Sequence, residues 1–266
     1  MYKLLAMDID DTILPRRGVI SERNKRAVKA AQEAGIYVTL ATGRGFHGSD
    51  TVRRELGIEG LIINYGGAMI NFGATGKPFF VTKLESETVV EILDLAEGMG
   101  LHVHLYQGDE IVYEHEHTYG TLYSQALDLP ARIEPNIRRM HWDNVPKVLI
   151  ITEPERVPDL LPFFREKLYG KAAVSASSPG FIEFNKIGAN KGTALKMIAD
   201  HIGVERGEVA AVGDNTLDIE MIEWAGLGCC VEDGNEEVKR AAKLIVPSCR
   251  EDGVAYLIEN YLLKEA

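Results

Sequence analysis

The chain has 266 residues, and 45% of them are hydrophobic, which is enough for one large domain or two smaller ones with a buried core. Its net charge of −11 argues against nucleic acid or an anionic membrane as a partner. No apolar run approaches the roughly 18 residues of a membrane span. No export signal precedes the first strand pattern, and the three cysteines suggest no disulfide framework. We therefore expect a cytoplasmic protein.

Strand and helix patterns alternate along the first segment. The run KLLAMDI is continuously apolar, as in a parallel strand covered on both faces. Ser21 can cap the helix that follows, and Gly35 can end it. The stretches IYVTLA, GFHGSDTVRREL and LIINY then predict a strand, a short helix and a third strand. This order predicts an α/β protein with a doubly wound, Rossmann-like parallel sheet, which binds ligands at the carboxyl ends of its strands.

A different pattern occupies the middle of the chain. AMINFGATGKPFFV predicts a hairpin, and apolar residues at helical spacing then predict a helix: Val89, Ile92, Leu93 and Ala96. Short strands and helices, including helices at 118–127 and 157–168, continue to FIEFN. The first pattern returns at Lys191, with the strand EVAAVGD and the helix TLDIEMIEWAG. We therefore expect an α/β core at 1–83 and 188–266, interrupted by an inserted α+β domain at 84–187.

Carboxylates follow two of the predicted core strands. Asp8 and Asp10 follow the first strand, and Asp214 and Asp218 follow the strand EVAAVGD. Their mutual repulsion would be costly unless a cation lay among them. A hard divalent cation with oxygen ligands is the natural solution, and Mg²⁺ is the commonest such ion beside phosphate. We expect Asp11, by contrast, to be a solvated turn residue.

The residues that could hold phosphate lie at similar positions. Thr42, Gly43 and Arg44 follow the second strand and supply a hydroxyl, an unhindered amide and a guanidinium. Lys191 begins a helix where the chain returns to the core. A lysine there is usually a solvated surface residue, but this position favours a role in the site.

Two other kinds of site are disfavoured. The stretch GRGFHG has the G-x-G-x-x-G spacing of a dinucleotide site, but the next strand ends in Asn64 and Tyr65, without the acidic residue that holds a ribose. Four histidines could suggest zinc: His102, His104, His115 and His117. No cysteine or fourth ligand set supports such a site, so we expect histidines at the surface or facing the hairpin.

Four motifs in this order resemble the haloacid dehalogenase superfamily of phosphatases. They are DIDDT at 8–12, ATGR at 41–44, NKGTAL at 190–195 and GDNTLDIEM at 213–221. The large insertion at 84–187, between the second and third motifs, is similar to the α/β cap domain of the Cof-type subgroup, subclass IIB. The resemblance thus implies a cap domain there that determines substrate specificity. The resemblance covers essentially the whole chain and includes INYGGAMI and EDGVAYLI.

The resemblance implies a role for each matching residue. Asp8 would be the nucleophile that forms an aspartyl-phosphate, and Asp10 would be the general acid and base. Mg²⁺ would be held by Asp8, Asp214 and the Asp10 main-chain carbonyl, while Asp218 would support the water shell of the metal. Thr42, Gly43 and Lys191 would grip the phosphoryl oxygens, with Arg44 assisting. Leu217 stands where Cof-type proteins commonly have an Asn that contacts phosphate. That contact is lost unless Asn215 or Thr216 replaces it.

The activity implied is Mg²⁺-dependent hydrolysis of small phosphorylated metabolites, with sugar phosphates as the favoured class. Three alternative functions are compatible with some of the same sequence features. A phosphomutase or phosphotransferase of this superfamily would use the same nucleophile. A receiver-like signalling module would also gather Asp, Thr and Lys at strand ends, although such modules are about half this length. A non-catalytic regulator that binds phosphate or sugar is supported only by Leu217.

Overall fold

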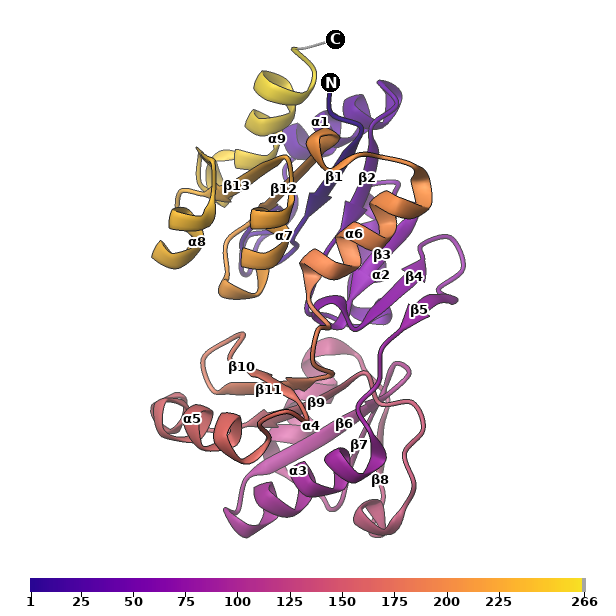
Figure 1. The fold of residues 1–266 in the computed structure, drawn as a ribbon, viewed down its shortest axis with the longest axis vertical. Coiled ribbons are helices and arrows are strands. Elements are labelled where there is room, and N and C mark those ends of the chain that lie inside the picture. The colour runs from indigo at the N-terminus through magenta and orange to yellow at the C-terminus, as the bar shows by residue number, and fades with distance from the viewer. Residues whose placement is uncertain (265–266) are drawn as a thin grey trace. The chain divides into compact units, whose positions relative to one another are not determined.

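The computed structural model describes residues 1–264, which form two compact units. The first comprises Met1–Arg44, Ser49–Phe80 and the chain from Asn190 onward. The second comprises Gly45–Gly48 and Val81–Ala189. Each unit has a sheet and helices of its own (Figure 1). Within residues 1–264, no helix is both long and apolar enough to cross a membrane.

A five-stranded parallel sheet lies at the centre of the first unit, in the order β14-β13-β12-β1-β2. Its strands are β1 (Leu4–Met7), β2 (Tyr37–Leu40), β12 (Val209–Gly213), β13 (Leu227–Val231) and β14 (Leu244–Val246). A parallel bridge between Ala41 and Ile63 links β2 to the small antiparallel sheet of β3 (Leu61–Asn64), β4 (Met69–Phe72) and β5 (Pro78–Val81). The predicted doubly wound α/β class is confirmed.

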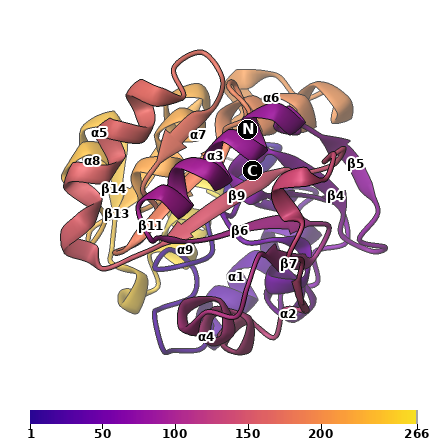
Figure 2. The ribbon, with the colours of Figure 1, turned by 90° about the horizontal axis from the view of Figure 1, so that it is seen from below.

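Helices pack on both faces of this sheet. Their bounds are α1 (Glu22–Glu33), α2 (Phe46–Glu55), α6 (Lys191–Ile202), α7 (Ile219–Trp224), α8 (Glu236–Ala241) and α9 (Gly253–Leu257). Helices α6 and α7 lie on one face, and α1 lies on the other (Figures 1 and 2). Leu4 and Ala6 of β1 belong to the same buried cluster as Leu195 and Ile198 of α6. Because β1 is covered on both sides, all four of its residues are fully buried.

The second unit has a six-stranded sheet in the order β10-β11-β9-β6-β7-β8. The strands are β6 (His102–Gln107), β7 (Glu110–Tyr113), β8 (Ala131–Ile133), β9 (Lys147–Ile151), β10 (Ala173–Ser175) and β11 (Phe181–Asn185). The helices are α3 (Ser86–Gly98), α4 (Thr118–Leu127) and α5 (Val157–Lys167). The predicted apolar face of α3 packs with Phe164 of α5 and Ile150 of β9 in one buried cluster, so α3 and α5 share one face of the sheet.

Several local signals act as the sequence predicts. The Ser21 hydroxyl accepts a hydrogen bond from the backbone N–H of Asn24 at the start of α1, and Gly35 follows the end of the helix with a positive φ of 85°. A further cap, which was not predicted, is that of Asn190, which accepts a bond from the Thr193 N–H at the start of α6. Two strands are missing from the sequence prediction, β8 and β14, each with only three residues.

The four histidines were expected at the surface or facing the hairpin, and two of them are not at the surface. His102 and His104 are 4% and 0% exposed, and their rings are joined by a hydrogen bond of 3.1 Å between Nε2 and Nδ1. Gly120 of α4 lies so close that a Cβ there would be 2.7 Å from His102 Cε1, so α4 covers this part of the sheet. Burial lowers the pKa of His102 to about 3 and lowers that of His104 well below its ordinary value.

We predict that the two histidines make the protein sensitive to acid. A buried histidine binds a proton more weakly in the folded protein than in the unfolded chain, where its pKa is about 6.5. Its full contribution to stability is therefore present above about pH 6.5. This contribution is lost as the pH falls from there toward the folded-state pKa. At about pH 5 His102 alone would cost about 2 kcal/mol of unfolding free energy, and His104 would add to this loss. Urea unfolding at about pH 7.5 and about pH 5 should therefore show a smaller acid loss for the double variant His102→Gln/His104→Gln than for the wild type.

The control for this comparison is His141→Gln, which removes an exposed histidine bonded to Asp143. It should keep the acid loss of the wild type. An equal acid loss in the wild type and the double variant would contradict the prediction.

A short loop after β3 contacts both the segment after β2 and the start of α6. Tyr65, Gly66 and Gly67 all have positive φ, at 50°, 65° and 101°. The Tyr65 N–H donates to the Arg44 carbonyl and the Gly66 N–H to the Thr42 carbonyl, so the loop holds the segment after β2. The Gly67 backbone lies against the carbonyl of Asn190, which begins α6, and a Cβ at Gly67 would overlap that carbonyl.

Two alanine substitutions should separate backbone strain from this close approach. Gly66→Ala adds a Cβ into open space at a positive φ, and we expect it to lower the unfolding free energy by about 1 kcal/mol. Gly67→Ala adds the overlap with Asn190, and we expect about 2 kcal/mol more. Urea unfolding of the two variants measures the difference. Equal losses would mean that the contact with Asn190 is not tight.

Candidate active site

The sheet brings Asp8 and Asp214 to the same edge. Asp8 follows β1 and Asp214 follows β12, and these strands are parallel neighbours with Met7 paired to Val212. The Asp8 N–H donates to the Val212 carbonyl at 3.0 Å, which extends the pairing to the site itself. Because the chain leaves β1 toward β2 and returns to β12 on its other side, these carboxylates lie at the switch point of the sheet.

Lys191 lies at the first turn of α6 and reaches two of the carboxylates. Its Nζ donates to Asp8 Oδ1 at 2.6 Å and to Asp218 Oδ1 at 2.5 Å. All three residues are buried, with exposed fractions of 2%, 5% and 0% for Lys191, Asp8 and Asp218. The structure therefore joins residues from the first, third and fourth motifs in direct contact. Lys191 is thus buried against two carboxylates, unlike the solvated surface lysine that is usual at the start of a helix.

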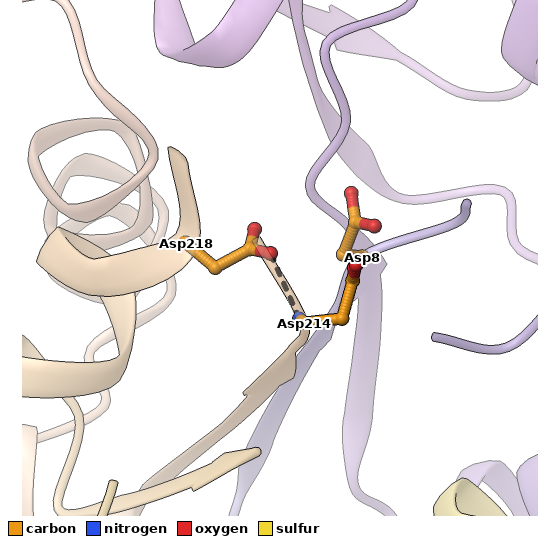
Figure 3. A group of neighbouring side chains, drawn as sticks. All are labelled: Asp8, Asp214 and Asp218. Atoms are coloured by element: carbon orange, nitrogen blue, oxygen red, sulfur yellow. Dashed lines mark hydrogen bonds between the residues drawn. The ribbon is translucent and has the colours of Figure 1, made fainter. Parts of the chain in front are cut away.

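Asp218 organises the turn after β12. Its Oδ2 accepts the backbone N–H groups of Asp214 and Asn215, each at 3.0 Å. Its carboxylate points from the start of α7 toward Asp214 and Asp8 (Figure 3). Since both Asp218 oxygens are already hydrogen-bonded, this residue is suited to holding its neighbours in place. The side chain of Asn215 accepts a bond from Thr216, 3.2 Å away.

The charges in this group do not balance. One oxygen each from Asp8, Asp214 and Asp218 lies within 4.8 Å of the others, and these three carboxylates share one ammonium group. Burial raises the pKa of Asp8 well above its ordinary value, and repulsion from Asp218 and Asp214 adds to this effect against the opposing influence of Lys191. Burial, followed by repulsion from Asp218, raises the pKa of Asp214 to about 7.

The same excess of carboxylates affects the pKa of Lys191. Burial by itself would lower the pKa of its ammonium group, but the carboxylates of Asp218 and Asp8 together raise it. Asp214 Oδ1 accepts a bond from the Thr12 hydroxyl at 3.0 Å. Among residues 1–264, no hydrogen-bond donor reaches Asp8 Oδ2 or Asp214 Oδ2. An all-oxygen donor set with excess negative charge fits a hard divalent cation.

The second motif lies at the end of β2. Thr42 is fully buried, its N–H donates to the Ile63 carbonyl, and its hydroxyl accepts the Arg44 N–H at 3.1 Å. A Cβ at Gly43 would meet nothing within 4 Å, so no side chain or backbone crowds the Cα of Gly43 on that side. The Arg44 guanidinium bonds to the Asp10 carboxylate, with Nε 2.9 Å from Oδ2 and Nη2 2.5 Å from Oδ1. Arg44 and Asp10 thus form an ion pair with two hydrogen bonds.

Sequence reasoning gave no role to some residues that shape the site. Thr12 is the last residue of the first motif, and its hydroxyl orients Asp214. The loop of Tyr65, Gly66 and Gly67 holds Thr42 and Arg44, and the pair of glycines directly after a strand is the signal that could have found it. Asp11 has a positive φ of 55° and accepts the Arg16 N–H, as expected of a turn residue.

Comparison with known proteins gives one consistent result. The family of haloacid dehalogenase-like hydrolases matches residues 5–258. The 5-amino-6-(5-phospho-D-ribitylamino)uracil phosphatase YitU of Bacillus subtilis (strain 168) is 28% identical over 97% of this chain and 97% of its own. A haloacid dehalogenase-like hydrolase from Bacteroides thetaiotaomicron is 30% identical, with a TM-score of 0.86 over 97% of this chain and 99% of its own.

A sugar phosphatase of haloacid dehalogenase subclass IIB has the same fold, with a TM-score of 0.82 at 21% identity over 97% of this chain and 98% of its own. These matches confirm the resemblance seen in the four motifs and the enzyme class that it implied. The chain belongs to the haloacid dehalogenase-like hydrolases, and it is an enzyme of their phosphatase type.

Proposed function

We propose that the protein is a Mg²⁺-dependent phosphomonoesterase that acts on small phosphorylated metabolites through an aspartyl-phosphate on Asp8. The observation that carries this proposal is the buried contact of Lys191 with Asp8 and Asp218, beside Asp214. This contact supports the proposal because it joins a carboxylate suited to nucleophilic attack, an ammonium group suited to binding phosphoryl oxygens, and further carboxylates suited to binding a metal ion. The three free, buried cysteines suit a reducing cytoplasm, where we expect the enzyme to act.

The residues at the sheet edge fit a magnesium ion. Asp8, Asp214 and the main-chain carbonyl of Asp10 would hold it, and Asp218 would keep the turn around Asp214 in place. When bound, the ion would offset negative charge on the phosphoryl oxygens. Such compensation is needed because a carboxylate and a phosphate oxygen 3.5 Å apart repel by about 5 kcal/mol per pair of unit charges at an effective dielectric constant of ~20.

The protein groups would carry out the reaction in two steps. In the first, a carboxylate oxygen of Asp8 bonds to phosphorus while the ester bond to the leaving oxygen breaks, and Asp10 gives that oxygen a proton. In the second, Asp10 takes a proton from water as the water oxygen attacks phosphorus, which releases phosphate and restores Asp8. Lys191, the Thr42 hydroxyl and the Gly43 amide would hold the phosphoryl oxygens in both steps.

We propose a sugar phosphate or similar polar metabolite as the substrate. Two observations support this class: the relative YitU is named for a phosphoribityl compound, and the subclass IIB protein of the same fold is named a sugar phosphatase. We further propose that residues 84–187, the predicted cap, select among such substrates. Reaction control by a cap or lid commonly works by excluding water from the bound ester.

The direct test is phosphate release. With Mg²⁺, the wild type should release orthophosphate from p-nitrophenyl phosphate and from some members of a sugar phosphate panel, without an organic acceptor. Asp8→Asn should lower kcat by roughly 1000-fold or more, because the amide is a poor nucleophile. Thermal unfolding would verify that this variant is folded. No release of phosphate from any substrate would refute the proposed activity, and release only with an acceptor would indicate a phosphotransferase.

Metal binding can be measured without turnover. Mg²⁺ at millimolar concentration should raise the melting temperature of the wild type because it relieves the repulsion among buried carboxylates. Asp214→Asn should lose this increase, yet be at least as stable as the wild type in EDTA, since it removes one of the repelling charges. Asp200→Asn, at an exposed carboxylate paired with Lys196, is the matched control and should respond to Mg²⁺ as the wild type does. A full response to Mg²⁺ in Asp214→Asn would place the ion elsewhere.

A further inference from the structure

Arg44 and Asp10 form a two-point ion pair at the edge of the proposed active site. The Arg44 Nε and Nη2 atoms each donate to a different oxygen of the same carboxylate. Such a fork fixes both the position of a carboxylate and the plane in which it lies, which a single ammonium contact cannot do. The pair is only partly covered, with 26% of the Arg44 side chain and 59% of the Asp10 side chain exposed.

The backbone of Arg44 is held on three sides. Its N–H donates to the Thr42 hydroxyl, and its carbonyl accepts the Tyr65 N–H at 2.9 Å and the Asn64 side-chain amide at 3.3 Å. The base of this long side chain is therefore fixed to the ends of β2 and β3. The guanidinium can therefore hold the carboxylate that it binds in a defined position.

Asp10 has less support from its own surroundings. It lies in the loop after β1, where a bridge to Leu14 and a bond from the Asp11 N–H to the Leu14 carbonyl hold the backbone. Its side chain is more than half exposed, so several rotamers would be open to it without a partner. A proton donor must lie within hydrogen-bond reach of the leaving oxygen, and restricting its rotamers favours that geometry.

We infer that Arg44 is a positioning residue for Asp10, which acts on the reaction through this carboxylate and not as a direct ligand of phosphate. The inference rests on the proposed function, because it concerns the group that would protonate the leaving oxygen. Lys191 differs in each respect: it is buried, its donors reach Asp8 and Asp218, and its ammonium is a compact charge. The two cations thus serve different carboxylates.

The two possible roles of Arg44 predict different kinetics. If it positions Asp10, Arg44→Gln should lower kcat/KM by roughly 10- to 100-fold for an alkyl ester such as glycerol phosphate, whose leaving oxygen needs a proton. The loss should be clearly smaller for p-nitrophenyl phosphate, whose leaving group departs without one. Affinity for orthophosphate, measured with Mg²⁺ by calorimetry, should change by less than about 3-fold. Arg44→Lys should not restore kcat/KM, because an ammonium cannot fix both carboxylate oxygens.

A double-mutant cycle provides the decisive comparison. In the Asp10→Asn background, adding Arg44→Gln should change neither kcat/KM nor orthophosphate affinity by more than about 2-fold, since the partner of Arg44 is already altered. A tenfold or greater loss of orthophosphate affinity on Arg44→Gln, in either background, would overturn the inference and make Arg44 a phosphate ligand. An equal loss of kcat/KM for the alkyl and aryl esters would also overturn it.

The matched control is Arg23→Gln, which removes another two-point pair on the surface of the same unit. Arg23 donates to Glu259 through Nε at 3.3 Å and Nη2 at 2.6 Å. This variant should keep the kinetics of the wild type. A wild type without phosphatase activity would refute the proposed function, whereas an active wild type with an effect of Arg44 independent of Asp10 would refute only this inference.

Discussion

The buried ammonium group of Lys191 is the contact on which the site depends. Three carboxylates gather where there is little water to screen them, and Lys191 bonds directly to Asp8 and Asp218. Removing one partner from such a buried group leaves an uncompensated charge, which is far more costly than losing a surface ion pair. One ammonium cannot balance three carboxylates. The remaining negative charge is what makes this edge of the sheet suited to a divalent cation.

Topology explains how residues so far apart in the chain meet. Parallel strands put their carboxyl ends at one edge, so neighbouring β1 and β12 present Asp8 and Asp214 together. Helix α6 adds Lys191 from its first turn, and the strained loop of Tyr65, Gly66 and Gly67 packs against the residue that caps this helix. The positive φ values of that loop are thus part of the support for the site, and their cost is offset by the backbone contacts that they permit.

The sequence predicted most of this arrangement because its strongest signals are local. Buried runs that end in Asp, and helices with caps and one apolar face, identify the sheet edge without any knowledge of distant contacts. Predictions were missing or wrong where contacts with residues distant in the chain determine the local structure or the burial of a side chain. Strands β8 and β14 have three residues each and exist through pairing with β7 and β13. The histidines were expected at the surface or facing the hairpin because no zinc ligand set accompanies them, yet α4 covers the face on which His102 lies.

Arg44 shows a further limit of sequence reasoning, and also why the structure has two kinds of cation. A guanidinium at the end of a strand could reach a phosphate or a carboxylate, and its position in the chain does not say which. In the proposed reaction the buried carboxylate of Asp8 must remain reactive, and the compact Lys191 ammonium balances its charge while binding only one of its oxygens. The charge of an exposed carboxylate such as Asp10 is stabilised by water, but its side chain can adopt several rotamers. The planar guanidinium, which bonds to both carboxylate oxygens, is suited to restricting these rotamers. The choice of lysine at one carboxylate and arginine at the other therefore follows from burial.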